Sequence, residues 1–321
     1  MRARVVTILT CLAVLVGPVA LGAVACARRA PASTTSALTG LPLGAGDDGP
    51  LLAVKIDNAR GARPWSGLEA ADVVYVEPVE GGATRLLAIF SSRRPPSVGP
   101  VRSFRESDLD VLSAYGRPGL VYSGAAPELS GALAAASVVP LSPATVPAAF
   151  RRDPDRTAPD NLYADPAALA AAAGGASPVT SAGGGFTFGS APAGGTASAG
   201  RSVAVGSTRV GAEWDAAAGR WSMSFDGRAA TARDGTRLAA ATVVVQTVRT
   251  TASSVSDVAG RVSPKAETVG EGAADVLRDG QVFGGRWSRA SAGSGTTVTG
   301  NDGAPIAFRP GPVWVLLVPA G

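Results

Sequence analysis

The amino-acid sequence predicts an α+β protein, in which an amino-terminal mixed α/β domain is followed by a mainly β carboxy-terminal domain. Three observations lead to this fold class. Strand-like and helix-like apolar patterns alternate over residues 49–173. After residue 200 the helical pattern nearly vanishes, and strand-like segments are separated by Asp-Gly turns. The chain has 321 residues, of which 46% are hydrophobic, and this supplies enough apolar side chains for a core in each domain.

Residues 1–26 have the pattern of a lipoprotein-type signal peptide. A short basic start precedes an apolar run over residues 5–24, and small residues lead to a cysteine. The run Ala23-Val24-Ala25-Cys26 is similar to a lipobox, although leucine is commonest where Ala23 stands. We expect Cys26 to carry lipid, palmitate included, and to anchor the exported protein to the outer face of the cytoplasmic membrane. The alternative is an uncleaved amino-terminal transmembrane helix, because about 20 apolar residues can span a bilayer.

Residues 27–48 are predicted to form a flexible tether, because they are rich in Ala, Ser, Thr, Gly and Pro and lack periodicity. The α/β domain is predicted to follow over residues 49–173. The strands predicted in it are Leu51–Asp57, Asp72–Glu77, Thr84–Phe90 and Gly119–Ser123. The helices predicted in it are Glu106–Tyr115, Ala132–Ala136 and Pro166–Ala173.

Residues 174–200 are mostly Gly, Ala and Ser, and they are predicted to join the two domains. The mainly β domain is predicted to cover residues 201–321. An Asp-Gly pair at Asp279-Gly280 stands between two apolar runs and is typical of a hairpin turn. The strands predicted here are Ser202–Val205, Arg220–Phe225, Ala241–Val248, Ala274–Leu277, Gln281–Trp287 and Val313–Val318.

The composition excludes several kinds of catalytic site. The sequence contains no histidine, which removes every Ser-His and Cys-His nucleophile pair and the commonest metal ligand. Both cysteines, Cys11 and Cys26, lie within residues 1–26, so the folded part has no thiol for a disulfide, a nucleophile or a metal site. No calcium-loop spacing is present. We therefore assign no catalytic residue and expect neither a metal nor a cofactor.

The charge balance argues against a nucleic-acid partner. The 29 basic and 25 acidic residues give a formal net charge of +4, and two of the arginines belong to the signal segment. Without these two arginines the remainder carries about +2, and it has no long basic run. We therefore expect no binding of nucleic acid.

Charged side chains gather near the ends of the predicted strands. Carboxylates and an amide follow the first two strands, and arginines begin the third strand and precede the first helix. Strand ends meet at one edge of an α/β sheet, where ligands bind in the crevice. Arginine forks bind carboxylate or phosphate groups, and carboxylates bind hydroxyls, so the set predicts an anion or glycan site. The candidate ligand-binding residues are Asp57, Asn58, Arg63, Glu77, Glu80, Arg85, Arg102, Arg105 and Asn161.

A structural role is the alternative for each of these residues. Half-buried arginines need partners, so Glu80 with Arg85, or Asp57 with Arg63, are candidate ion pairs that hold loops in place. Ion-pair networks also occur away from functional sites. The hypothesis of a ligand site therefore depends on the whole group rather than on any one residue.

Several ordered sequence blocks resemble those of a known family. They are Ala53-Val54-Lys55-Ile56-Asp57-Asn58, Val79-Glu80-Gly81-Gly82-Ala83-Thr84-Arg85, Val98-Gly99-Pro100-Val101-Arg102-Ser103, Ala158-Pro159-Asp160-Asn161-Leu162-Tyr163 and Ile306-Ala307-Phe308-Arg309-Pro310-Gly311. This succession resembles the YerB-like family of bacterial lipoproteins, which is built from a domain of unknown function with amino- and carboxy-terminal parts. The resemblance covers roughly residues 38–319. It implies the extracytoplasmic location and the two-part plan, and it brings no reaction, substrate or cofactor.

Two positions depart from the family pattern. Asp160 stands where the family has a histidine, so no proton-transfer role is assigned to this position. Lys55 replaces a residue that is usually apolar.

The sequence as a whole predicts a membrane-anchored, extracytoplasmic protein that binds an envelope component without catalysis. Peptidoglycan or another envelope glycan is the expected ligand at that location, and an envelope protein is the other expected partner. The alternative is a cell-wall glycan hydrolase or transferase, because such enzymes need only two carboxylates at a defined separation. Asp57, Glu77 and Glu80 are the candidates for that pair.

Overall fold

The computed structural model describes residues 35–43, 49–178, 183–257 and 260–320. The predicted signal peptide with Cys26, the alternative membrane-spanning segment at residues 5–24 and much of the predicted tether lie outside these ranges. Within the described ranges, no helix combines the length and the apolar character needed to cross a bilayer.

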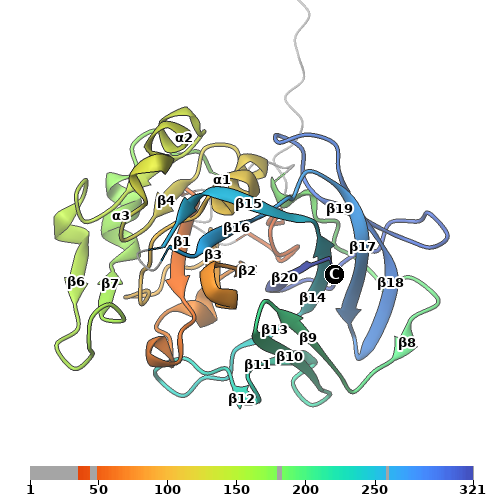
Figure 1. Cartoon of the computed structure of the whole chain (residues 1–321). Coiled ribbons are helices and arrows are strands. Elements are labelled where there is room, and N and C mark those ends of the chain that lie inside the picture. The colour runs from red at the N-terminus through yellow and green to blue at the C-terminus, as the bar shows by residue number, and fades with distance from the viewer. Residues whose placement is uncertain (1–34, 44–48, 179–182, 258–259, 321) are drawn as a thin grey trace, which may run out of the picture. The chain divides into compact units, whose positions relative to one another are not determined.

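One mixed sheet of eleven strands runs through the described residues (Figure 1). In spatial order its strands are β19 (Thr297–Gly300), β18 (Gln281–Arg289), β17 (Gly270–Arg278), β14 (Thr242–Val248), β20 (Val313–Pro319), β2 (Val73–Pro78), β3 (Thr84–Phe90), β1 (Leu52–Asp57), β4 (Gly119–Val121) and β5 (Val139–Leu141), and β8 (Thr196–Ala197) also pairs with β18. The strand β3 is antiparallel to both of its neighbours, β1 and β2. The strands β1 and β2 therefore end at the edge of the sheet where β3 begins.

Smaller strand groups complete the β structure. A five-stranded sheet contains β12 (Arg228–Ala229), β11 (Arg220–Phe225), β10 (Thr208–Asp215) and β9 (Gly200–Val205) in this spatial order, and β13 (Ala239–Ala240) pairs with β11. Two antiparallel pairs stand apart from the sheets: β15 (Thr250–Ser256) with β16 (Val262–Ala266), and β6 (Phe150–Arg152) with β7 (Leu162–Ala164).

The helices of the described residues are short. They are α1 (Glu106–Leu112), α2 (Ser130–Ala135) and α3 (Pro166–Ala172). Asp165 caps α3, because its side chain accepts hydrogen bonds from the free backbone N–H groups of Ala167 and Ala168, and Pro166 suits the first helical position. Single 3-10 turns lie at Arg60–Ala62, Leu68–Ala70, Glu80–Gly82, Ser113–Tyr115, Pro127–Leu129, Pro147–Ala149 and Gly183–Gly185.

The chain is thus α+β and mostly β, with a β-rich carboxy-terminal part. The first three predicted strands begin and end within one residue of β1, β2 and β3. The pair β15–β16 is among the strands that the sequence pattern does not predict, because β15 is rich in Ser and Thr and mostly exposed. The mixed α/β character of residues 49–173 stays a prediction.

The central strands of the large sheet are buried on both faces. Leu52, Val54 and Ile56 of β1 belong to one hydrophobic cluster, whereas the intervening Ala53 belongs to another on the opposite face. The helix α1 packs on the second face through Val111 and its neighbours. Burial on both faces explains why β1 reads as a continuous apolar run instead of an alternating pattern.

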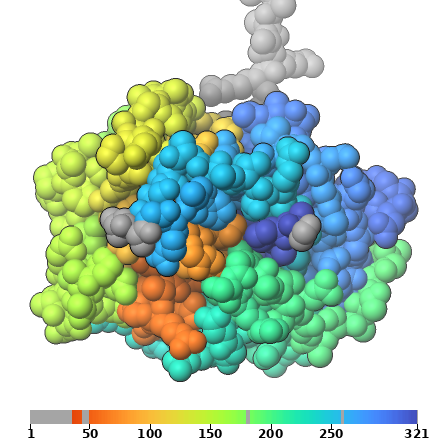
Figure 2. Space-filling view, in the orientation of Figure 1, coloured from red at the N-terminus to blue at the C-terminus, as the bar shows by residue number. Residues whose placement is uncertain are grey.

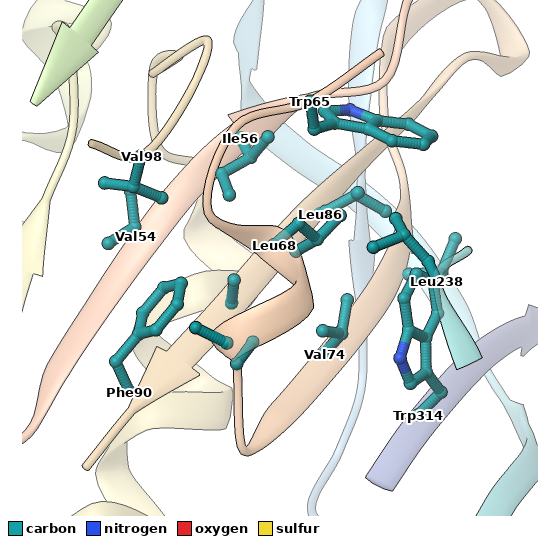
Figure 3. Close-up of a cluster of buried hydrophobic side chains, with 14 of the residues drawn as sticks. Val54, Ile56, Trp65, Leu68, Val74, Leu86, Phe90, Val98, Leu238 and Trp314 are labelled. Atoms are coloured by element: carbon teal, nitrogen blue, oxygen red, sulfur yellow. The ribbon is translucent and has the colours of Figure 1, made fainter. Parts of the chain in front are cut away.

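The five-stranded sheet covers the first face. Its Trp221 and Phe225 pack in the same cluster as Trp314 of β20. The ring of Trp65 lies edge-on to Phe225, with 5.4 Å between the centroids. Figure 3 shows Trp65, Leu238 and Trp314 among the side chains of this cluster.

The strand β20, which comes from the end of the chain, lies between β2 and β14 and is parallel to both. Residues 73–76 of β2 pair in register with residues 313–316 of β20. One sheet therefore contains segments from both sides of the expected junction at residues 174–200. The division into two domains stays a prediction.

Candidate functional site

A cavity of about 800 Å³ opens at the sheet edge where β1 and β2 end and β3 begins. We call it the arginine pocket. Seven of the nine candidate residues line it: Asp57, Asn58, Arg63, Glu80, Arg85, Arg102 and Arg105. Within the described residues, Glu77 and Asn161 are not part of its lining.

Three further segments, which the sequence pattern does not indicate, complete the wall of the arginine pocket. Residues 125–128 precede α2, residues 207–208 lie at the start of β10, and residues 255–257 with Arg261 belong to the β15–β16 region. Figure 2 shows the blue surface of β15–β16 next to the orange surface of residues 50–90. These segments are distant in sequence, so only the tertiary fold brings them to the site.

The strand register places three charged residues in one row. Asp57 of β1 pairs with Arg85 of β3, and Arg85 pairs in turn with Glu77 of β2. Directly paired residues of antiparallel strands point to the same face of a sheet. Arg85 therefore lies between two carboxylates, at the end of the face on which α1 packs.

The ion pairs of the pocket differ from the pairs that the sequence suggests. Nε of Arg102 lies 2.6 Å from a carboxylate oxygen of Asp57, and Arg105 contacts Glu80 through two nitrogens, the second at 3.1 Å. The pairs differ because the segment before α1 runs beside β1, where the backbone N–H of Arg102 donates to the carbonyl of Lys55. This pairing brings Arg102 and Arg105 to the strand end.

Arg85 differs from these arginines, because no carboxylate oxygen of the described residues lies within 4.0 Å of its guanidinium. Its Nη1 donates to the carbonyl of Ser103 at 3.0 Å. Burial, followed by the nearby charge of Arg105, lowers the pKa of Arg85 to about 10, and the opposing charges of Asp57 and Glu80 offset this only in part. The half-buried Arg85 cation is therefore under-compensated and suited to an anion.

A polar network holds the wall next to β1. The side chain of Asn58 donates to the hydroxyl of Thr84 at 2.7 Å and accepts from Nε of Arg63 at 3.1 Å. Arg63 also lies 3.3 Å from Asp226, which belongs to the turn after β11. Asn58 and Arg63 are thus engaged in joining the two sheets. Asn161 lies elsewhere and accepts from Arg152 at 2.6 Å.

Asp160 lies beside Asp57 and within hydrogen-bonding reach of it. Burial, followed by the negative charge of Asp57, raises the pKa of the Asp160 carboxyl. Asp160 therefore lies next to the ion pair of Asp57 with Arg102.

Glu77 is completely buried in a charged triad below the pocket. Its carboxylate contacts Nζ of Lys55, and the same Nζ lies 2.7 Å from Asp108 of α1. Asp108 also accepts from the backbone N–H of Arg105 at 2.5 Å and so begins the helix. The triad connects β1, β2 and α1, and none of its members lines the pocket.

The charge of the triad makes protein stability depend on pH. Burial, followed by the negative charge of Asp108, raises the pKa of Glu77 from its ordinary value of 4.5 to about 8. The folded state therefore holds a proton that the unfolded chain loses above pH 4.5. This contribution to stability is complete below pH 4.5 and is lost as the pH rises through 8.

We expect the variant Glu77→Gln, which mimics the protonated carboxyl, to flatten the fall in stability between pH 5 and pH 8. Urea unfolding of the wild type and the variant at both pH values measures this. An equal fall in the free energy of unfolding of the two proteins would contradict the view that Glu77 is protonated in the folded state. Glu271→Gln is the control, because Glu271 is exposed in its pair with Arg286.

No group of three or more carboxylates or thiols in the described part of the chain is arranged to hold a metal ion. What the arrangement offers is an open, mixed-charge cavity with arginine donors, carboxylate acceptors and hydroxyls.

Fold and site together define an α+β protein with a charged pocket at the strand ends of its main sheet. The chain belongs to the DUF3048 family of proteins of unknown function: residues 38–179 match its N-terminal domain, and residues 202–315 match its C-terminal domain. This confirms the resemblance that the sequence blocks indicate.

Two similarities to Bacillus subtilis proteins agree with this membership. A protein named "Putative lipoprotein YerB" is 47% identical over 64 residues, which are 20% of this chain and 19% of that relative. The match thus spans about a fifth of the relative's length. The crystal structure of the YerB protein is similar with a TM-score of 0.74 at 24% sequence identity, over 90% of this chain and 97% of that one. The second likeness shows a shared fold.

Proposed function

We propose that this protein is an exported, membrane-anchored binding protein that holds a component of the cell envelope in the arginine pocket without transforming it. One observation carries the proposal: Arg85 presents an under-compensated cation inside an 800 Å³ cavity. An arginine fork in such a position binds oxyanions strongly.

The location of the ligand follows from the anchor. The sequence at Cys26 has the features of a lipidation site, and the name of the Bacillus subtilis relative contains the word lipoprotein. A lipid on Cys26 would hold the folded part at the outer face of the cytoplasmic membrane. Peptidoglycan, another envelope glycan or an envelope protein is then within reach.

The state of the carboxylates supports binding over hydrolysis. Asp57 is paired with Arg102, Glu80 is paired with Arg105, and Glu77 is buried outside the pocket. A glycosidase needs one carboxyl as a proton donor and a second as a nucleophile or base, separated by about 5 Å or more. The ion pairs leave neither Asp57 nor Glu80 available in that form.

Capture of muramidase-solubilised wall fragments by the full-length protein in detergent tests the proposal. We expect the wild type to retain fragments and to release no new reducing ends. The variant Ala125→Trp should weaken retention at least tenfold, because a bulky ring at this exposed lining position fills the cavity. Ala290→Trp is the matched control at an exposed position outside the lining.

Two results would contradict the proposal. Equal retention by wild type and Ala125→Trp would place binding outside the pocket. Release of reducing ends by the wild type, abolished in Glu80→Gln, would make the protein a hydrolase.

A further inference from the structure

We infer that the ligand of the arginine pocket carries one negative charge on a hydroxyl-rich body without an aromatic ring, as in a sugar or polyol bearing a phosphodiester or a carboxylate. The inference rests on the proposed binding function and narrows the ligand to one chemical class. Three properties of the pocket carry it: its charge, the free donors of Arg85, and the nature of its lining.

The charge of the described lining gives the first property. Six arginines face five carboxylates, an excess of one positive charge. Four carboxylates are each paired with an arginine: Asp57 with Arg102, Glu80 with Arg105, Asp226 with Arg63, and Asp257 with Arg261. The remaining groups are Arg60, Glu128 and Arg85. Arg60 and Glu128 are exposed, so solvent screens them, and the excess charge is concentrated on the half-buried Arg85.

The hydrogen bonds of Arg85 give the second property. A guanidinium has five N–H donors, and among the described residues the acceptor for Arg85 is the carbonyl of Ser103. None of its nitrogens is buried without a partner, so the unused donors reach the open cavity. One oxyanion can accept two parallel hydrogen bonds from such a fork. A dianion would exceed the charge that the pocket leaves uncompensated.

The lining gives the third property. The volume is in the range of organic ligands and is far larger than one small ion. The described lining contains no Phe, Tyr or Trp side chain, and its apolar members, such as Ala83 and Val79, are small. A nucleobase would lack a stacking partner, and an acyl chain would lack apolar surface. Hydroxyls of Ser207 and Ser256 and the carboxylates suit a polyhydroxy body instead.

Isothermal titration calorimetry with the full-length protein in detergent, at pH 7.5 and low salt, tests the inference. The probes are glycerophosphoglycerol, a phosphodiester; glucuronic acid, a carboxylate; glycerol 3-phosphate, mostly a dianion at this pH; and N-acetylglucosamine, which is neutral. We expect at least one of the two monoanions to bind at least tenfold more tightly than the other two probes. Tighter binding of glycerophosphoglycerol assigns a phosphodiester, and tighter binding of glucuronic acid assigns a carboxylate.

Variants identify the residue responsible. Arg85→Gln should weaken binding of the preferred monoanion at least tenfold, and Arg85→Lys should weaken it less, because lysine keeps the charge and loses the fork. Arg286→Gln, an exposed arginine outside the lining, should bind as the wild type does. Thermal unfolding checks that each variant is folded. If Arg85→Gln does not fold, the weakened binding is measured on Arg85→Lys alone.

Three results would overturn the inference: a preference for the dianion or the neutral sugar, unchanged binding in both Arg85 variants, or no binding of any probe. The proposed function has a separate criterion. Loss of wall-fragment retention in Ala125→Trp would still support binding at the pocket even when every small probe fails.

Discussion

Ending the chain after Gly311 should abolish folding, because this change removes β20 from the middle of the large sheet. Val313, Trp314, Val315, Leu316 and Leu317 are all buried, with exposures of 0 to 2%. Burial of five such side chains contributes about 7 to 15 kcal/mol. The whole free energy of unfolding of a typical protein is about 5 to 15 kcal/mol. The strands β2 and β14 would also each lose a neighbour.

Limited proteolysis and urea unfolding measure the outcome. We expect the truncated chain to be degraded rapidly and to show no cooperative transition. A chain lacking only Gly321 is the control, because this residue follows the strand. Cooperative unfolding of the longer truncation would show that the rest of the sheet folds without its central strand.

Replacing Lys55 by methionine should lower the free energy of unfolding by about 3 to 5 kcal/mol, since removing one partner of a buried ion pair leaves charge uncompensated. Lys55 is completely buried between Glu77 and Asp108. Without its ammonium, the two carboxyls must both be protonated or carry unpaired charge in an apolar interior. Urea unfolding at pH 7 measures the loss.

The triple variant Lys55→Met, Glu77→Gln and Asp108→Asn separates the effect of buried charge on stability from the effect of altered packing. We expect it to be more stable than Lys55→Met alone, because it removes the buried charges together with their counter-ion. A loss below about 1 kcal/mol in the single variant would contradict the view that the triad is under electrostatic constraint.

The location of the candidate site follows from the sequence because it depends on local rules. The apolar runs at residues 51–56 and 84–90 define two strands, and polar residues at strand ends meet at one edge of a sheet. These rules bring Asp57, Glu80 and Arg85 to one cavity. The predicted membership of the family is confirmed by the domain matches.

The pairing within the site could not be predicted, because it depends on contacts between distant segments. Arg102 reaches Asp57 only through the segment that runs beside β1, where Ile56 forms a bridge with Val101. Glu77 lies outside the pocket in the triad with Lys55 and Asp108, which are 22 and 31 positions away from it in sequence. Lys55 within an apolar run was the available signal, since a lysine in a buried strand requires a carboxylate partner.

The wall of the arginine pocket is contributed by residues from Asp57 to Arg261, which are roughly 200 positions apart. These segments meet only in the folded chain, so an occupant of the pocket binds the folded state and not the unfolded one. A true ligand must therefore stabilise the folded state and raise the melting temperature. At a ligand concentration of a hundred times its dissociation constant, the free energy of unfolding rises by about 2.7 kcal/mol. A melting screen of fractionated envelope extracts can thus find the natural occupant while its chemical structure is still unknown, and the molecule needs neither a label nor an enzymatic assay.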